Sequence, residues 1–377
     1  MRRWIALITT FVMLFAIAGC AQADDGDGNG QGAGSGSFQE TEEGSKDLPE
    51  EADAANGRSG DDGKGSEADE DHTPYGLHGE LSLDGTRIVD EHGADFQLRG
   101  MSTHGINWFP EYVNEEAFRT LRDEWGLNCI RLALYTAEYD GYCEGGDKEA
   151  LKGLVRDGVE YASALGMYVI IDWHVLQDET PKAYEEEAMS FFEEMSAELA
   201  DRGNVLYEIC NEPNGDTTWS EVRSYAEDII PVIRRNSPES IVIVGTPDWS
   251  QGIDQVASDP LTGSESENVL YAVHFYAKDH TQWLRDRVID ALDDGIPVFF
   301  SEFSTCEASG SGANDFEQAE AWLELADEHD ISYCFWSLSN KDDTSSIISP
   351  SSGSVSDWSE DELTETGRWA KGHLSTS

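Results

Sequence analysis

The chain has 377 residues and a formal net charge of −52, from 76 Asp and Glu against 24 Lys and Arg. Its 39% hydrophobic residues exclude a wholly disordered protein and suffice for one large folded domain. Because a surface this negative repels phosphate backbones, we expect no nucleic-acid partner. Acids spread along the whole chain are typical of proteins adapted to concentrated salt, where screening removes their mutual repulsion.

The first twenty residues have the features of an export signal. Arg2 and Arg3 precede an apolar run, Trp4–Ala18, which is too short for a membrane span but suits a signal peptide. The sequence Ile17-Ala18-Gly19-Cys20 resembles a lipobox, which predicts lipidation of Cys20 and an extracellular protein tethered to the cell surface. An ordinary cleaved signal with a chance cysteine is the alternative, and the Sec and twin-arginine export routes both stay open. Contact with a membrane is expected only through this anchor.

Residues 21–72 are rich in Gly, Ser, Ala, Asp and Glu, with 16 acidic and 3 basic residues. Only Phe38 and Leu48 are large and apolar, so this segment cannot bury enough surface to offset its chain entropy. We predict a disordered acidic linker here, followed by a single folded domain at residues 73–377.

Five cysteines follow the signal, and Cys129, Cys210 and Cys334 lie in apolar runs typical of buried strands. An odd number without CxxC spacing argues against a zinc ribbon and against a full disulfide framework. The sequence does not say whether any one disulfide forms.

Eight short apolar runs alternate with amphipathic stretches in the folded domain. The runs are nearly continuous in Ile, Val, Leu and aromatic residues, as expected for strands buried on both faces. They are Phe96–Ser102, Asn128–Leu134, Met167–Trp173, Val205–Cys210, Ile241–Gly245, Val269–Phe275, Val298–Phe303 and Tyr333–Leu338. Helical patterns cover Glu115–Trp125, Asp147–Leu165, Pro181–Asp201, Trp219–Asn236, Thr281–Asp293, Phe316–His329 and Glu360–His373, with a weakly helical connection at Ser250–Asn268.

Eight such units predict an α/β fold of the (β/α)8 TIM-barrel type. An open doubly wound sheet is the alternative, but no GxGxxG or P-loop motif opens a helix. Leu77–Arg87 and Ile88–Gln97 are predicted to form a small β-hairpin that closes the bottom of the barrel.

Polar side chains follow seven of the eight runs, at the strand ends that form the active site in this fold. Glu212 follows the fourth run and Glu302 lies near the end of the seventh, among His, Tyr and Trp residues. Paired carboxylates in such surroundings are typical of glycosidic bond hydrolysis, which needs a proton donor and a nucleophile or base. His104, His174 and His274 come from separate strands without an HxH or HExxH pair, which argues against a catalytic metal. The GxSxG motif of serine hydrolases is absent.

The same segments resemble glycoside hydrolase family 5, and most of all its bacterial endo-β-1,4-glucanases. The similarity covers residues 74–374 and rests on ordered motifs in residues 98–105, 128–132, 171–174, 207–213, 274–276, 301–303 and 335–339. It implies that Glu212 is the acid/base and Glu302 the nucleophile of a retaining reaction. Ser304 departs from the glycine that many relatives have at this position, which affects the local loop but not the two carboxylates.

The resemblance also implies roles for residues around the catalytic pair. Asn211 would contact the sugar 2-hydroxyl, Arg131 and Tyr276 would keep Glu302 ionised, and His174 and His274 would position the substrate and the catalytic pair. Trp336 would lie under the sugar just before the scissile bond, Trp108 and Lys341 further along the glycone side, and Trp219 on the leaving-group side. The substrate-binding residues that we expect are His104, Trp108, Tyr135, Trp219, Trp336, Lys341 and Asp343.

These features predict a monomeric endo-β-1,4-glucanase that acts on cellulose-type polysaccharide, without a cofactor or a metal. Residues 336–341 favour β-1,4-glucan, but a β-mannanase or another β-glucanase of the same family is the alternative, because these enzymes share the catalytic residues. A non-catalytic glycan-binding barrel is the rival outside the enzymes, and the intact Glu212 and Glu302 argue against it. No carbohydrate-binding module is recognised, so we expect soluble or amorphous glucan rather than crystalline cellulose as the substrate.

Overall fold

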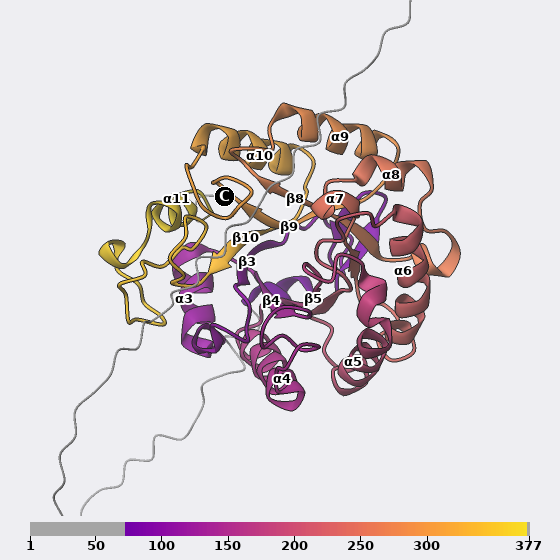
Figure 1. Cartoon of the computed structure of the whole chain (residues 1–377), viewed down its shortest axis with the longest axis horizontal. Helices are drawn as coiled ribbons and strands as arrows, with labels where there is room; N and C mark the ends of the chain where they lie inside the picture. Colours follow the sequence, from indigo (N-terminus) through magenta and orange to yellow (C-terminus); the bar gives the residue numbers. More distant parts are fainter. Residues whose placement is uncertain (1–71, 375–377) are drawn as a thin grey trace, which may run out of the picture. The chain divides into compact units, whose positions relative to one another are not determined.

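Eight parallel strands form a closed barrel in the computed structural model, which describes residues 72–374 (Figure 1). Neighbouring strands pair in the order β10-β3-β4-β5-β6-β7-β8-β9. The strands are β3 (Arg99–Thr103), β4 (Cys129–Tyr135), β5 (Tyr168–His174), β6 (Val205–Glu208), β7 (Val242–Val244), β8 (Val269–Tyr276), β9 (Val298–Ser304) and β10 (Tyr333–Leu338). The predicted TIM barrel is therefore confirmed. The predicted signal peptide with Cys20, and all of the predicted linker except His72, lie outside the described residues.

A ring of helices surrounds the strands (Figure 1). The helices are α3 (Glu115–Trp125), α4 (Lys148–Ala164), α5 (Glu185–Glu198), α6 (Trp219–Arg234), α7 (Pro247–Ser250), α8 (Ile253–Ser258), α9 (Gln282–Asp293), α10 (Phe316–Glu328) and α11 (Glu365–Leu374). Short 3₁₀ helices cover Pro110–Tyr112, Pro181–Tyr184, Gly263–Ser266 and Glu360–Glu362. Between residues 72 and 374, no helix is long and apolar enough to cross a membrane.

Capping side chains explain why some helix ends match the sequence pattern so closely. The side chain of Asn114 accepts a hydrogen bond from the backbone of Ala117 at the start of α3, and Gly126 ends this helix with a φ of 69°. Thr218 and Glu221 form a capping box at the start of α6. The predicted helix Pro181–Asp201 is instead divided into a 3₁₀ helix and α5.

The N-terminal end of the barrel is closed by a short hairpin, as the sequence predicts. Strands β1 (Ser82–Asp84) and β2 (Arg87–Val89) pair antiparallel, and Leu81 and Ile88 pack against the side chains at the bottom of the barrel. A short helix that the sequence pattern did not indicate, α2 (Pro74–His78), precedes the hairpin, with Thr73 as its N-cap. The bottom of the barrel is thus a packed core that leaves the opposite end for chemistry.

The five cysteines of the described residues are all free thiols. Cys129 and Cys334 both pair in register with Gly100 on the strand between them. A Cβ at Gly100 would lie 2.5 Å from the sulfur of Cys334, so only glycine fits between these two buried cysteines. Cys210 is also buried, as expected for cysteines in apolar strands.

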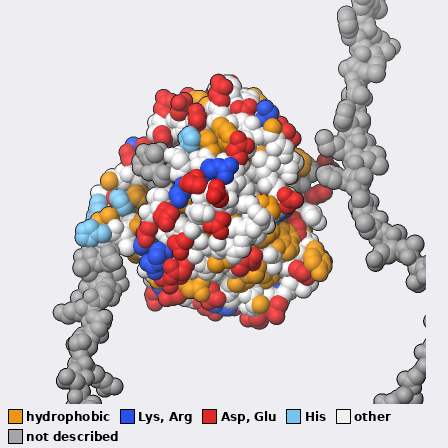
Figure 2. All heavy atoms as spheres, turned by 90° about the vertical axis from the view of Figure 1, so that its left-hand side faces the viewer, with side chains coloured by type: hydrophobic (Ala, Val, Ile, Leu, Met, Phe, Trp, Pro, Cys, Tyr) orange, Lys and Arg blue, Asp and Glu red, His pale blue; other side chains and the backbone are white. Residues whose placement is uncertain are grey.

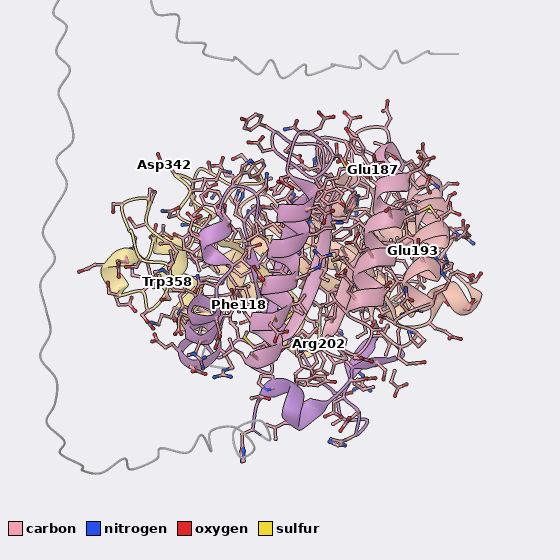
Figure 3. All side chains as sticks on the ribbon, turned by 90° about the horizontal axis from the view of Figure 1, so that it is seen from below. Phe118, Glu187, Glu193, Arg202, Asp342 and Trp358 are labelled. Atoms are coloured by element: carbon pink, nitrogen blue, oxygen red, sulfur yellow. The ribbon has the colours of Figure 1, made fainter. Side chains whose placement is uncertain are left out.

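The C-terminal segment packs against the outside of α3. Trp358, which Figure 3 shows beside Phe118 of α3, lies 6.5 Å from the ring of Trp125 in an edge-on arrangement. Helix α11 also contacts α3, so the last and the first helices of the ring are neighbours (Figure 1).

Acidic side chains are scattered over the outer surface, with fewer Lys and Arg among them (Figure 2). Of the 19 Lys and Arg residues in the described part of the chain, all except Arg234, Arg285 and Arg368 lie within ion-pair distance of a carboxylate. Many of these pairs join neighbouring helices, such as Arg156 on α4 with Glu198 on α5. The excess acids have no such cation to neutralise them.

Candidate active site

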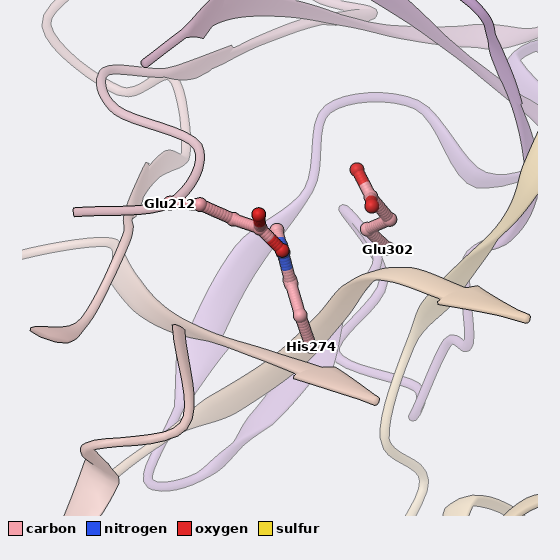
Figure 4. A group of neighbouring side chains, drawn as sticks. All are labelled: Glu212, His274 and Glu302. Carbon is pink, nitrogen blue, oxygen red and sulfur yellow. The ribbon is translucent and has the colours of Figure 1, made fainter. Parts of the chain in front are cut away.

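Two carboxylates face each other at the C-terminal end of the barrel. Glu212 follows β6 and Glu302 lies on β9, and Figure 4 shows both carboxylates converging beside the ring of His274. One oxygen of each carboxylate and one ring nitrogen of His274 all lie within 4.8 Å of one another. Both glutamates line a cleft of about 440 Å³. The arrangement places two groups capable of proton transfer or nucleophilic attack on one bound molecule.

Two side chains hold the Glu302 carboxylate in place. Its two oxygens accept hydrogen bonds from separate donors, one from the Tyr276 hydroxyl at 2.8 Å and one from Arg131 Nη1 at 3.2 Å. Both donors are buried, so water competes little for these bonds. A carboxylate held in this way is suited to nucleophilic attack.

A single guanidinium organises the polar interior below the cleft. Arg131 is fully buried, and it donates to Glu208 at 2.6 Å and to the Asn211 side chain at 2.6 Å, while Asp172 lies 3.0 Å away. Burial alone would raise the pKa of Glu208, but the charges and hydrogen bonds of Arg131 and His274 together outweigh it and lower that pKa to about 2. Glu208 is therefore ionised at neutral pH and balances the buried cation.

A chain of hydrogen bonds connects Glu212 to this guanidinium. His274 Nδ1 lies 2.9 Å from Glu212 Oε1, and His274 Nε2 lies 2.9 Å from the Ser301 hydroxyl. Ser301 in turn donates to Glu208 at 2.7 Å. Burial would lower the pKa of His274, but the adjacent carboxylates of Glu208 and Glu212 raise it to about 9. A protonated His274 then donates to both Glu212 and Ser301.

Comparison with known proteins decides the family of this barrel. The family model described as cellulase (glycosyl hydrolase family 5) matches residues 89–342. The chain belongs to glycosyl hydrolase family 5. It is therefore a glycoside hydrolase, and Glu212 and Glu302 occupy the cleft of a family 5 barrel.

Curated relatives and solved structures agree with this assignment. The chain is 46% identical to endoglucanase A of Butyrivibrio fibrisolvens over 295 residues, which cover 78% of this chain and 68% of that protein. It is 36% identical to the catalytic domain of Thermobifida fusca endoglucanase Cel5A, solved with cellotetraose, with a TM-score of 0.76 over 80% of this chain and 99% of that one. A halotolerant family 5 cellulase from an Icelandic hot spring isolate is 35% identical, with a TM-score of 0.74 over 80% of this chain and 96% of that one. The chain spans 56–68% of the length of five curated relatives that it matches.

Most of the predicted substrate-binding residues lie together in the family 5 cleft. The residues that line it include His104, Tyr135, His174, Trp336, Lys341 and Asp343. The Trp336 ring stacks on His174 at 5.4 Å between ring centres. Trp108 lies at the edge of this group, where its ring is 4.6 Å from that of Tyr135 and its indole donates to the Tyr139 carbonyl.

His104 is a neutral side chain that lines the cleft. Its Nδ1 accepts a hydrogen bond from the Gly105 backbone at 2.7 Å. Burial and the nearby Lys341 charge lower the pKa of His104 to about 3. The other ring nitrogen, Nε2, lies 3.2 Å from Lys341 Nζ. Lys341 also pairs with Asp343 at 3.0 Å, so this corner offers both donors and an acceptor to sugar hydroxyls.

Asn211 lies beneath the cleft, and Trp219 lies away from it. Asn211 is fully buried beneath the cleft, where its oxygen is bound to Arg131 and its amide donates to the Val175 carbonyl. One amide hydrogen of Asn211 remains to reach a bound sugar. Trp219 does not line the cleft, because it lies on the buried face of α6, where its indole donates to the Asp259 carbonyl and its ring packs edge-on against Tyr271.

Trp249 lines the cleft instead, on the side opposite Trp336 and Lys341. It is 48% exposed and lines the cleft on the loop after β7, across the barrel from β3 and β10. Asp248, Trp249 and Ser250 all have φ values between 54° and 59°, a conformation that is uncommon for residues other than glycine. Backbone hydrogen bonds from Trp249 to Pro213 and from Ser250 to Thr246 hold this turn.

Sequence reasoning also missed Asp172, Glu208 and Ser301, which support the site from below. All three lie inside buried strands, with no exposure to solvent. For Asp172 and Glu208 the sequence held a usable signal, namely an acidic residue within an otherwise apolar run. A buried carboxylate is stable only beside a cationic or hydrogen-bonding partner.

Glu212, His274 and Glu302 also offer three ligand atoms close enough for a metal ion. The positive charge of Arg131 lies 3.2 Å from Glu302, and His274 is protonated at neutral pH. Both charges oppose a second cation at this point. The donor set therefore suits acid–base and nucleophilic chemistry better than a metal.

Proposed function

We propose that the chain is a retaining endo-β-1,4-glucanase that cleaves internal bonds of cellulose-type polysaccharide. The observation that carries the proposal is the distance of at most 4.8 Å between carboxylate oxygens of Glu212 and Glu302. Retaining glycosidases hold their two carboxyl groups about 5–5.5 Å apart, whereas inverting enzymes need about 6.5–9.5 Å to admit a water molecule. The short separation favours direct attack by one carboxylate on the sugar.

The contacts of each carboxylate support its role. A Glu302 oxygen attacks the anomeric carbon as the glycosidic C–O bond breaks, and Glu212 gives its proton to the leaving oxygen. Glu212 then takes a proton from water, whose oxygen attacks the same carbon and releases Glu302. Two donors stabilise the charge of Glu302 before it attacks and again when water releases it, while Glu212 has a side-chain contact to His274 and a second oxygen for proton transfer.

The layout of the cleft supports action within a chain rather than at its end. His104, Trp336 and Lys341 lie on the β3 and β10 side of the catalytic pair, and Trp249 lies on the β7 side. Sugar can therefore extend from the scissile bond in both directions. The names of the relatives, which are endoglucanases, support β-1,4-glucan as the substrate.

Hydrolysis of a glucan panel, followed by proton NMR of the first product, tests this proposal. We expect release of reducing sugar from carboxymethylcellulose and lichenan, with much less from mannan and xyloglucan. The first product should be the β-anomer. An α-anomer would contradict retention, and a preference for mannan would move the chain to the β-mannanases of the family.

We propose further that the enzyme is exported, tethered through Cys20 and adapted to salt. The signal-like residues 1–20 and the excess of acids over bases support these points, as does the similarity to a halotolerant cellulase. Metabolic labelling with a radioactive fatty acid should mark the wild type but not Cys20→Ser. Equal labelling of both proteins would contradict the anchor.

A further inference from the structure

Trp283 is an exposed tryptophan just outside the cleft. It lies in the first turn of α9, directly after the loop that follows β8, and 42% of its surface is exposed. Burying an indole gains free energy, so a large aromatic side chain left in solvent is informative where it adjoins a binding site. Its neighbour His280 lines the cleft, together with Trp249 and Gln251.

Three contacts hold the Trp283 ring in place. The Arg287 guanidinium lies over it at 5.1 Å from the ring centre, His280 packs against it edge-on at 5.9 Å, and its indole donates to the Asp279 carbonyl at 3.4 Å. A ring that is already fixed loses little side-chain entropy when a ligand stacks on it.

Arg287 also connects this ring to the segment that carries Trp249. It donates to the Gln251 carbonyl at 3.5 Å and lies 3.4 Å from the Asp254 carboxylate. Arg287 thus links the Trp283 ring to the segment just after Trp249, and His280 beside Trp283 lines the same cleft as Trp249.

His280 supplies a hydrogen-bond donor beside the Trp283 ring. Its Nδ1 accepts a hydrogen bond from the Tyr276 backbone at 2.8 Å. Burial lowers the pKa of His280 to about 4, so the ring is neutral and its proton belongs to Nε2. Within residues 72–374, no hydrogen bond to Nε2 is formed.

We propose that Trp283 and His280 form a distal subsite that binds a glucosyl residue on the leaving-group side, beyond Trp249. The apolar CH face of the sugar stacks on the indole, and a sugar hydroxyl accepts the His280 proton. This inference rests on the proposed glucanase function, and its occupant is the reducing-end portion of a β-1,4-glucan chain.

Steady-state hydrolysis of cellohexaose and of an aryl β-cellobioside tests the subsite. The hexaose reaches distal subsites, whereas the aryl substrate has no sugar on the leaving-group side. We expect Trp283→Ala to raise the KM for cellohexaose about 3- to 10-fold, the size of one stacking contact, and to shift cleavage toward other bonds. The loss of kcat/KM should be at least about threefold larger for the hexaose than for the aryl substrate. Trp283→Phe should recover most of the loss.

Met189→Ala is a matched control, because Met189 is an exposed apolar residue on α5, away from the cleft. It should leave both substrates unaffected. If Trp283→Ala lowered kcat/KM equally for both substrates, Trp283 would have a structural role. If it lowered kcat/KM for neither, the proposed subsite would be contradicted. If the wild type hydrolyses no glucan, the proposed function fails, and calorimetric binding of cellohexaose to wild type and Trp283→Ala then decides the subsite alone.

Discussion

Carboxylates have different roles in the barrel interior and on the outer helices. In the interior, Glu208, Glu302 and Asp172 share the Arg131 guanidinium, and each lies at a fixed distance from it. On the outer helices, acids outnumber the available cations, and their pairs join partly exposed side chains such as Arg235 and Glu193. Exposed pairs contribute about 0–1 kcal/mol each, whereas removing one partner of a buried pair costs about 3–5 kcal/mol. Position, more than residue type, therefore decides what a carboxylate does here.

The largest effect should come from the interior residue that forms the bond to the sugar. We expect Glu302→Gln to lower kcat on the order of 10⁴-fold or more, because the amide cannot act as the nucleophile. Binding of cello-oligosaccharide, measured by calorimetry, should persist. Residual turnover above about 1% of wild type would contradict this assignment.

Glu212→Gln should be selective in its effect. Hydrolysis of carboxymethylcellulose should fall about 10²- to 10⁴-fold, since the poor leaving group needs a proton. A dinitrophenyl cellobioside, whose leaving group needs none, should lose far less in its first step. Pre-steady-state kinetics on both substrates measure the difference. Equal losses would mean that Glu212 is not the acid.

Ser301→Ala tests the chain of hydrogen bonds behind Glu212. Without the hydroxyl, the protonated form of His274 loses an acceptor, so the pKa of His274 should fall from about 9. We expect kcat to drop about tenfold and the basic limb of its pH profile to move to lower pH. Ser304→Ala, on the same strand, removes a buried hydroxyl outside this chain. If the basic limb of the pH profile moved equally in both variants, the role of Ser301 would be one of packing alone.

Glu138→Gln should change stability rather than chemistry. Glu138 is buried on the loop after β4, where its Oε1 accepts from the Gln177 backbone and its Oε2 has no partner among the described residues. Burial raises the pKa of Glu138 from 4.5 to about 7. A raised carboxyl pKa stabilises the fold at acidic pH, and this contribution is lost as pH rises from 4.5 through 7. The variant should therefore match the wild type near pH 4 and exceed it by about 1–3 kcal/mol at pH 8.

Chemical denaturation of wild type and Glu138→Gln at several pH values measures this difference. A gap between the two proteins that does not grow with pH would show that ionisation of Glu138 is not the cause.

The smallest effects per residue should come from the outer surface. Glu187→Gln on α5, a residue visible at the edge of Figure 3, should change the free energy of unfolding by less than about 1 kcal/mol. The summed repulsion is larger, since the folded domain has 60 acids against 19 bases in residues 73–377. We expect the Tm to rise strongly between about 0.05 and 3 M NaCl, because the Debye length falls below the spacing of most surface charges. A flat or falling Tm would contradict adaptation to salt.

The sequence predicts the elements of this barrel well because its strands are buried on both faces. Each strand is a continuous apolar run, and the observed strands differ from the predicted runs mainly at their ends, as in Phe96–Ser102 against Arg99–Thr103. Helix ends with capping residues are also predictable from sequence, and α3 begins after Asn114 and ends before Gly126. The pairing of Glu212 and Glu302 in one cleft is predicted because barrel strands deliver their ends to one site.

Trp219 and Trp249 show where such prediction ends. Trp219 opens a helix whose buried face continues with Val222, Ala226 and Ile229, a spacing that marks the tryptophan as core. Trp249 lies in a turn whose residues have positive φ values. The turn contains no Gly or Asn that would indicate this backbone conformation from the sequence. Backbone conformation of this kind depends on tertiary hydrogen bonds, so local sequence does not reveal it.

Arg131 has a consequence for how the barrel folds. Its contacts come from β3, β5 and β6, and also from Glu302 on β9, which is 171 residues away along the chain. A partly folded chain that lacks β9 would bury this cation without one of its anionic partners, which is costly. Half-closed barrels are thereby penalised, and strands far apart in the chain must come together in one cooperative step. Such long-range closure predicts slow refolding, with the enzyme gaining its active site and its fold at the same moment.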